Sequence, residues 1–266
     1  MVKDGEGLSA LYARLDDLAA KAERGEVAVS QFLTPRELHY SVQYLARIGL
    51  PAKTFGGYDN AERQRIYILP EYIDIGEEAE LGEVLSEFGF SLEVASLEIV
   101  GSGYKTLTHR DFLGSLLGLG IDRDVLGDIV LTEEKGKRAV VFCSASIADF
   151  IETALERVGN DKVRARNIKL DKEELPQRKF APINDTVASA RLDCIVASLC
   201  SLSRAKAQEA ITAGLVELDY ECEERSDRVV APPAFISVRG HGKFRVHSVS
   251  DVTRKGRFRL VADKYV

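Results

Sequence analysis

The sequence has few of the residues that build metal centres and disulfide frameworks. Its four cysteines, Cys143, Cys194, Cys200 and Cys222, are scattered and form no CxxC pair, and its four histidines form no HxxxH or HExxH motif. This spacing argues against a zinc site and against a disulfide framework, and it indicates reduced thiols in a cytosol-like compartment. We therefore expect neither a metal nor any other cofactor.

The sequence also lacks a long apolar run. The first residues, MVKDGEG, contain acidic residues and two glycines and lead into no apolar stretch, which is not the pattern of a signal peptide. No later segment is long enough to cross a bilayer. We expect a cytoplasmic protein, or a protein of the plastid stroma in a photosynthetic eukaryote, without a membrane partner.

Signatures of enzymes that act on RNA are missing as well. A pseudouridine synthase carries its catalytic aspartate in an RLD-type motif followed by Thr-Ser-Gly, whereas RLD at 191–193 is followed by CIV. A methyltransferase needs a glycine-rich loop after a strand, whereas GLGID at 118–122 follows a predicted helix. The HIGH and KMSKS signatures of aminoacyl-tRNA synthetases are absent, and no nucleophile–base or carboxylate pair stands out. We expect no catalytic residue and no small-molecule substrate.

Charge is unevenly distributed along the chain. The net charge of −6 argues by itself against nucleic-acid binding, but residues 237–259 hold seven basic residues and one acid. A local basic face on an acidic protein can bind a phosphate backbone while the rest of the surface limits indiscriminate adhesion. The same charges would also prevent a solvent-exposed sheet edge from pairing with a strand of another molecule. Charge alone leaves these two interpretations open.

Residues 1–75 are predicted to form a small α/β domain. Leucines recur at helical spacing over 8–24. A second helix is predicted after Thr34, which suits the N-cap and completes a capping box with Glu37. A strand near 65–69 follows a glycine turn.

Residues 76–170 are predicted to form a ferredoxin-like domain of the RRM type, with the order βαββαβ. An RRM stacks bases on aromatic residues of its central strands, but the third strand of this domain offers only Phe142. The fold therefore favours a structural or docking module over base stacking. The predicted elements are strands at 92–100, 126–132, 138–144 and 162–170, and helices at 109–119 and, capped by Ser146, 146–158.

The remaining chain is predicted to hold a linker at 171–185 and a last domain at 186–266. The linker contains two prolines and mixed charges. The last domain places two helices against a small twisted sheet, which makes the fold class of the whole chain α+β. Its predicted elements are helices at 190–200 and 204–213 and strands at 216–220, 234–240, 243–249 and 257–262.

The motif pattern of the last domain resembles an S4 RNA-binding domain. RLD opens one helix, SRAKAQEAI opens the next, and LVELD and ISVRGHGKF follow. With HRDFLGSLLGLG and GDIVL upstream, the whole chain resembles the YlmH-type S4-domain proteins of bacteria and plastids. Two positions depart from the S4 pattern: Asp219-Tyr220 stands where many S4 domains have Asn-Gly, and Pro232-Pro233-Ala234 where many have Gly-Asp. These departures affect the loops and leave the helix ends unchanged.

The start of the second S4 helix is the predicted RNA-binding site. Arg204 and Lys206 place two cations at the positive end of the helix dipole, which a bound phosphate explains and local stability does not. Arg191 starts the preceding helix and is positioned to join them, and the basic hairpin turn is predicted to follow a second stretch of backbone. The predicted RNA-binding residues are Arg191, Ser203, Arg204, Lys206, Arg239, His241, Lys243 and Arg245.

Several residues also have a purely structural interpretation. Asp193 is expected to hold Arg191 or an exposed amide in place, and Ser203 is needed as an N-cap even without RNA. His241, between two glycines, fits the demands of a tight turn. Tyr58 and Arg63 lie in a glycine-flanked segment that we expect to be a solvated loop rather than an RNA contact.

Phosphate contacts fix register and read little sequence, so the expected target is structured ribosomal or transfer RNA recognised by shape. The YlmH resemblance implies binding to the large ribosomal subunit and to peptidyl-tRNA during rescue of stalled translation, which is a form of translation quality control. Three alternatives stay open. The protein could be an accessory to rRNA modification, a scaffold at the division site, or a plastid or cyanobacterial protein described by its effect on photosystem II.

Overall fold

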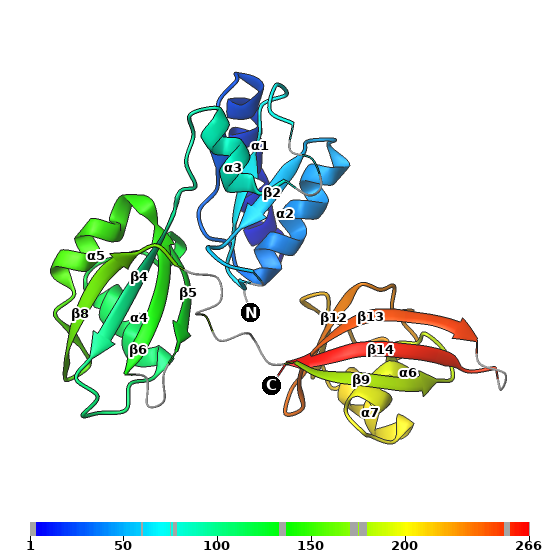
Figure 1. Cartoon of the computed structure of the whole chain (residues 1–266). Helices are drawn as coiled ribbons and strands as arrows, with labels where there is room; N and C mark the ends of the chain where they lie inside the picture. Colours follow the sequence, from blue (N-terminus) through cyan, green and yellow to red (C-terminus); the bar gives the residue numbers. More distant parts are fainter. Residues whose placement is uncertain are drawn as a thin grey trace. The chain divides into compact units, whose positions relative to one another are not determined.

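The structure is a computed structural model that describes residues 4–59, 61–74, 76, 79–132, 137–170, 175, 180–252 and 256–265. The chain divides into a first unit, Met1–Pro176, and a C-terminal unit, Gln177–Val266 (Figure 1). Each unit has its own hydrophobic core and is described separately.

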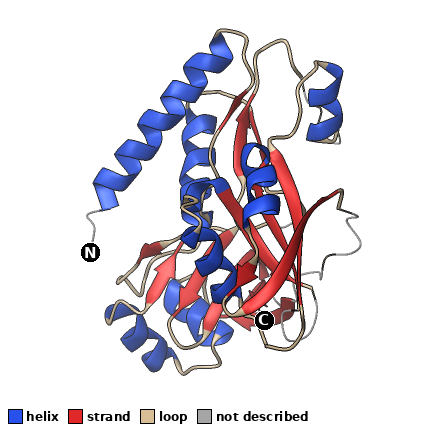
Figure 2. Cartoon of the chain, turned by 90° about the vertical axis from the view of Figure 1, so that its left-hand side faces the viewer, coloured by secondary structure: helices blue, strands red, loops and turns tan. Residues whose placement is uncertain are grey.

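The first unit begins with an α/β domain built on a three-stranded sheet of order β1-β3-β2. Leu11, Leu15 and Leu45 pack against Ile66 and Ile68 of the central strand to form its core. The helix that begins near the N-terminus is the long blue helix of Figure 2. The elements are α1 (Asp4–Glu23), β1 (Ala28–Val29), α2 (Pro35–Arg47), β2 (Ala52–Phe55), β3 (Arg65–Ile68) and α3 (Leu81–Glu87).

The start of α2 confirms the predicted capping box. The Thr34 hydroxyl accepts a hydrogen bond from the Glu37 N–H at 3.3 Å, and the Glu37 carboxylate accepts one from the Thr34 N–H at 2.8 Å. Two backbone donors that the helix leaves unpaired are thereby satisfied.

The second domain of the first unit has the ferredoxin-like topology that the sequence predicts. Its sheet order is β5-β6-β4-β8-β7, so the first and third strands of the βαββαβ unit lie at the centre. Leu97, Ile99 and Val141 pack on Phe112 and Ile151 of the two helices. The elements are β4 (Val94–Gly101), α4 (His109–Gly118), β5 (Leu126–Leu131), β6 (Arg138–Ser144), α5 (Ala148–Ala154), β7 (Arg157–Val158) and β8 (Asp161–Ile168).

The second helix of this domain is shorter than predicted. Residues Ala145–Ile147 form a 3-10 turn, the α-helical N-cap is Ile147, and no side chain caps it, so the capping role predicted for Ser146 is wrong. The helix ends at Ala154 because the following residues join β7 and turn back into β8 around Gly159, whose φ is +57°.

The C-terminal unit packs two helices on a six-stranded antiparallel sheet of order β11-β10-β12-β13-β14-β9. The first of these helices buries one apolar face, on which Leu192, Ile195, Val196 and Leu199 lie. The elements are β9 (Phe180–Val187), α6 (Leu192–Leu199), α7 (Arg204–Thr212), β10 (Val216–Leu218), β11 (Glu221–Cys222), β12 (Ala234–Val238), β13 (Gly242–Val252) and β14 (Phe258–Tyr265).

Strand β9 occupies part of the segment predicted as a linker. It pairs along its whole length with β14, from Val187 opposite Phe258 to Phe180 opposite Tyr265. Strand β9 is an edge strand, the position in a sheet at which a proline such as Pro182 is tolerated. The proline and the charges obscured a strand whose Ile183 and Val187 pack on the core. The predicted linker residues 171–174 and 176–179 lie outside the described residues.

Candidate RNA interface

The N-terminus of α7 is built as the sequence predicts. Ser203 is the N-cap, and its hydroxyl accepts a hydrogen bond from the Lys206 N–H at 3.3 Å. Arg204 and Lys206 are exposed, and the first turn contains no acidic residue. The helix therefore presents its positive end to solvent together with two cations.

A buried carboxylate, Asp193, organises this helix end. Its side chain has no exposed surface and accepts hydrogen bonds from Arg191 Nε (3.1 Å), Arg204 Nε (3.0 Å) and Gln208 Nε2 (2.8 Å). Burial alone would raise the pKa of Asp193, but the hydrogen bonds from Arg191, Gln208 and Arg204 outweigh it and hold the pKa well below its ordinary value. The predicted structural role of Asp193 is confirmed, and the sequence missed its bonds to Arg204 and Gln208.

This arrangement fixes two guanidinium groups without covering them. The Arg191 side chain remains 37% exposed and that of Arg204 54% exposed, although both bind the same carboxylate. One buried negative charge thus orients two positive charges at the starts of α6 and α7, and Lys206 adds a third. An excess of positive charge beside free helix N–H groups is the chemistry that binds a phosphate.

A second basic segment lies against the same end of α6. Leu192 N–H donates to the Arg228 carbonyl oxygen at 2.8 Å. The Glu223 carboxylate lies within 3.4 Å of Arg225 and 3.7 Å of Arg228, and both arginine side chains are more than half exposed. Sequence reasoning missed these two arginines, because only the cluster EERSDR marked them and nothing in the pattern placed it beside α6.

The hairpin residues form a separate group. Arg239, His241 and Lys243 are exposed around a turn that needs Gly240 at φ +83° and Gly242 at φ +114°. The Arg239 N–H donates to the Leu215 carbonyl oxygen, just beyond the C-terminal end of α7. The nine residues of α7 span about 13 Å, and Ser203 caps the opposite end of that helix. The structure therefore does not bring the hairpin turn to the helix-end cluster.

Arg245 lies on the sheet rather than at the hairpin turn. It pairs across the strands with Phe235, its guanidinium carbon lies 5.7 Å from the centre of that ring, and its Nε is buried without a hydrogen-bond partner. Tyr220 stacks on the same ring, with centroids 5.5 Å apart. Arg245 is thus more enclosed than the other predicted RNA-binding residues.

The turn that departs from the S4 sequence pattern keeps a tight backbone geometry. Asp219 and Tyr220 adopt φ of +50° and +69° between paired strands β10 and β11, the geometry for which Asn-Gly is usual. The Asp219 carboxylate accepts a hydrogen bond from the Phe235 N–H at 2.8 Å, which holds this strained turn in place.

In the central domain, the face that an RRM would offer to RNA is partly occupied by the chain itself. Tyr58 stacks on Phe142, with centroids 4.8 Å apart and an interplanar angle of 25°, and its hydroxyl donates to Asp128 at 2.8 Å. Gly57 lies so close that a Cβ there would be 2.1 Å from the Phe142 ring. Phe142 has no exposed surface, so base stacking at this position is blocked.

The expectation of a solvated loop around Tyr58 and Arg63 is wrong. Arg63 is 8% exposed, and its guanidinium donates to the carbonyl oxygens of Phe32, Leu126 and Arg123. These contacts join the two domains of the first unit. A buried arginine needs such acceptors, which lie far away in the sequence and left no local signal.

The described residues offer neither a metal-binding cluster nor a membrane-spanning helix. Among the described residues, no group of three or more His, Cys, Asp or Glu side chains lies where it could hold a metal ion. No helix in the described ranges is both long and apolar enough to cross a bilayer.

Two regions of the chain match models of one protein family. Residues 11–73 match the model described as YlmH, N-terminal, and residues 87–172 match the model described as a putative RNA-binding domain in YlmH. A curated relative from Bacillus subtilis (strain 168), Ribosome-associated protein quality control protein P2, is 32% identical over 244 residues, which cover 91% of this chain and 89% of the relative. A solved structure, Cell division protein ylmH from Streptococcus pneumoniae, is 19% identical with a TM-score of 0.48, over 60% of this chain and 90% of that chain.

Proposed function

The chain belongs to the YlmH family, and from this premise we propose that it is a non-catalytic protein that binds structured ribosomal or transfer RNA on the large ribosomal subunit and acts in translation quality control. The name of the Bacillus subtilis relative supports a ribosomal context. The sequence supports the absence of catalysis, since it carries none of the signatures of RNA-modifying enzymes.

The observation that carries the proposal is the cation cluster at the start of α7. Asp193 holds Arg191 and Arg204 in place, and Lys206 occupies a first turn that contains no acid. A phosphate bound there satisfies the helix N–H groups and the guanidinium groups at the same time. Contacts of this kind fix the position of a folded RNA and read little of its sequence.

The experiment that tests the proposal is co-sedimentation of the protein with separated large subunits, separated small subunits and bulk tRNA at rising salt. The double variant Arg204→Ala/Lys206→Ala is compared with wild type. A matched control, Lys21→Ala/Arg24→Ala, removes two exposed cations at the end of α1.

We expect salt-sensitive binding to the large subunit that the Arg204/Lys206 variant loses and the Lys21/Arg24 variant keeps. If folded wild-type protein binds none of the RNA samples, the proposal is wrong and a protein scaffold becomes the better explanation. Binding that both variants retain would move the contact away from α7.

A further inference from the structure

The outward face of the central sheet has a sealed half and an open half. In the sealed half, Val140 and Phe142 are covered by Tyr58 and by Leu170 and Leu175. In the open half, the outward side chains of β8 from residue 162 to residue 166 are exposed. This division leaves part of an RRM-like surface accessible while its usual stacking position is filled.

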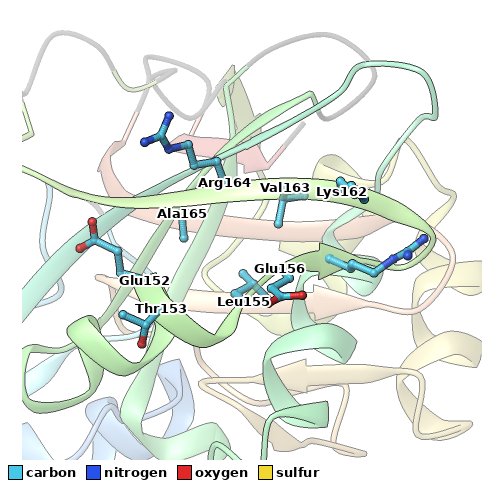
Figure 3. Close-up of a pocket in the computed structure, with 9 residues that line it drawn as sticks. Glu152, Thr153, Leu155, Glu156, Lys162, Val163, Arg164 and Ala165 are labelled. Atoms are coloured by element: carbon cyan, nitrogen blue, oxygen red, sulfur yellow. The ribbon is translucent and has the colours of Figure 1, made fainter.

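Three cations, Lys162, Arg164 and Arg166, line the open half, and we call them the β8 row. They alternate with Val163 and Ala165, which pack on the helix side of the sheet. Figure 3 shows Arg164 on the side of the β8 ribbon opposite Ala165 and the α5 residues Glu152 and Thr153. All three cations of the row are exposed. Alternate residues of a strand lie about 6.7 Å apart, close to the spacing of successive phosphates along an extended nucleic-acid strand.

The β8 row has little internal compensation for its charge. Glu98 is opposite Arg166 in register, but its carboxylate forms an ion pair with Arg138 at 2.6 Å. In the described ranges, no hydrogen bond or ion pair occupies the side chains of Lys162, Arg164 or Arg166. A depression of about 390 Å³ beside β8 is lined by Glu152 and Glu156 and also by Arg157, Lys162 and Arg164. No ion pair among the described residues joins these two carboxylates to the row.

An exposed aromatic side chain lies in a loop that is hydrogen-bonded to the first residue of β8. Tyr104 is 91% exposed in the loop after β4. Its N–H donates to the Ser102 hydroxyl oxygen at 3.2 Å, and Ser102 donates to Asp161, the first residue of β8. The loop is therefore tied to the strand that carries the cations. Lys137 runs along the same loop, with its side chain next to Gly103.

We propose that the β8 row and Tyr104 bind a single-stranded segment of RNA, with the cations on successive phosphates and Tyr104 stacked on a base. This inference rests on the proposed function and adds a second RNA contact, of a different type from the helix end of the C-terminal unit. Cations beside an exposed ring are the usual elements of a single-strand site. An acidic protein partner would use the cations and leave Tyr104 without a role.

The test measures affinity for a labelled single-stranded RNA of mixed sequence over a range of salt concentrations. Three variants of the full chain are used: Arg164→Ala/Arg166→Ala, Tyr104→Ala, and the control Lys21→Ala/Arg24→Ala. All the altered side chains are exposed, so the fold should be retained. Co-sedimentation with large subunits is measured in parallel.

We expect the Arg164/Arg166 variant to bind single-stranded RNA at least tenfold more weakly, with a salt slope lower by about 1.4, since each lost phosphate contact removes about 0.7. Tyr104→Ala should weaken binding about tenfold and leave the slope unchanged. The control should match wild type. Subunit binding through α7 should persist in all three variants.

Three results would overturn the inference. In the first, the Arg164/Arg166 variant binds single strands as the control does. In the second, wild type binds large subunits but no single strand, which leaves the proposed function standing. In the third, the Arg164/Arg166 variant no longer co-sediments with large subunits but keeps its affinity for single-stranded RNA, which would mean that the β8 row binds a ribosomal protein. Failure of wild type to bind any RNA would contradict the proposed function itself.

Discussion

The helices α2 and α4 differ from α7 at the third residue of the first turn. In α2 and α4 this position holds Glu37 and Asp111, and each carboxylate completes a capping box with the threonine at the N-cap. In α7 the N-cap is Ser203, but the third position holds Lys206, and no acid lies in the first turn. The same chain therefore caps two helices for stability and leaves a third with its positive end uncompensated.

This difference separates a structural helix end from a binding one. A carboxylate at the third position satisfies the N-cap N–H and favours the helix dipole, so its replacement by a cation gives up local stability. Asp193 holds Arg191 and Arg204 through hydrogen bonds, but it does not pair with Lys206. A ligand phosphate would supply the charge that Glu37 supplies in α2.

The largest effect is expected from Asp193→Ala, which removes the buried acceptor shared by two arginines and a glutamine. Loss of three hydrogen bonds to a buried carboxylate should lower the free energy of unfolding of the C-terminal unit by about 3 kcal/mol, although the two arginines stay partly exposed to solvent. Urea unfolding of the full chain measures this loss, with Glu209→Gln on the exposed side of α7 as the control. A loss no greater than that of the control would mean that Asp193 does not organise the site.

The Asp193 carboxylate should also make the stability of the wild-type protein sensitive to acid. Because the pKa of Asp193 is lower in the folded state than in the unfolded state, its contribution to stability is complete above the unfolded pKa, near pH 4. That contribution disappears as the pH falls through the folded pKa. As the pH falls from about 5 to about 2, the free energy of unfolding should decrease more for wild type than for Asp193→Asn. Parallel pH profiles for the two proteins would contradict this assignment.

Lys206→Glu converts α7 into a helix start like that of α2. The change places an acid where a capping box needs it, so stability should rise by about 0.5 kcal/mol. Affinity for large subunits should fall about tenfold or more, because one cation is replaced by an anion at the phosphate position. Thermal unfolding and co-sedimentation measure the two quantities. A variant that is less stable and binds RNA normally would remove the distinction between the two helix types.

Glu37→Lys makes the opposite exchange in α2. It removes the acceptor of the Thr34 N–H and places a cation at the positive end of the dipole, so stability should fall by about 1 kcal/mol. RNA affinity should stay at the wild-type level, because this helix end is not the predicted RNA contact. The same two assays apply, and a loss of RNA binding in a folded protein would show that α2 also faces the ligand.

Local patterns predicted most of this architecture. Thr34 and Glu37 defined a helix start, and Leu192, Ile195 and Val196 defined a buried face, because neighbours within one or two turns determine both features. The sequence also placed Ser203, Arg204 and Lys206 together, since they are adjacent in the chain.

The errors concern contacts between residues far apart in sequence. Tyr58 and Asp128 are 70 residues apart, and no local pattern shows that this tyrosine covers Phe142. Strand β9 escaped prediction because its pairing with β14 outweighs the poor strand propensity of its Pro182. Asp193 was assigned one arginine and has two, since the second comes from a neighbouring helix that only packing brings near.

The central claim is that the N-terminus of α7 binds an RNA phosphate. The most direct test is the salt dependence of affinity for the large ribosomal subunit, measured for wild type and for Arg204→Ala/Lys206→Ala, with circular dichroism to confirm that both are folded. If each residue neutralises one phosphate, the slope of log affinity against log salt should fall by about 2 in the variant. An unchanged slope in a folded variant would show that this helix end does not face the RNA.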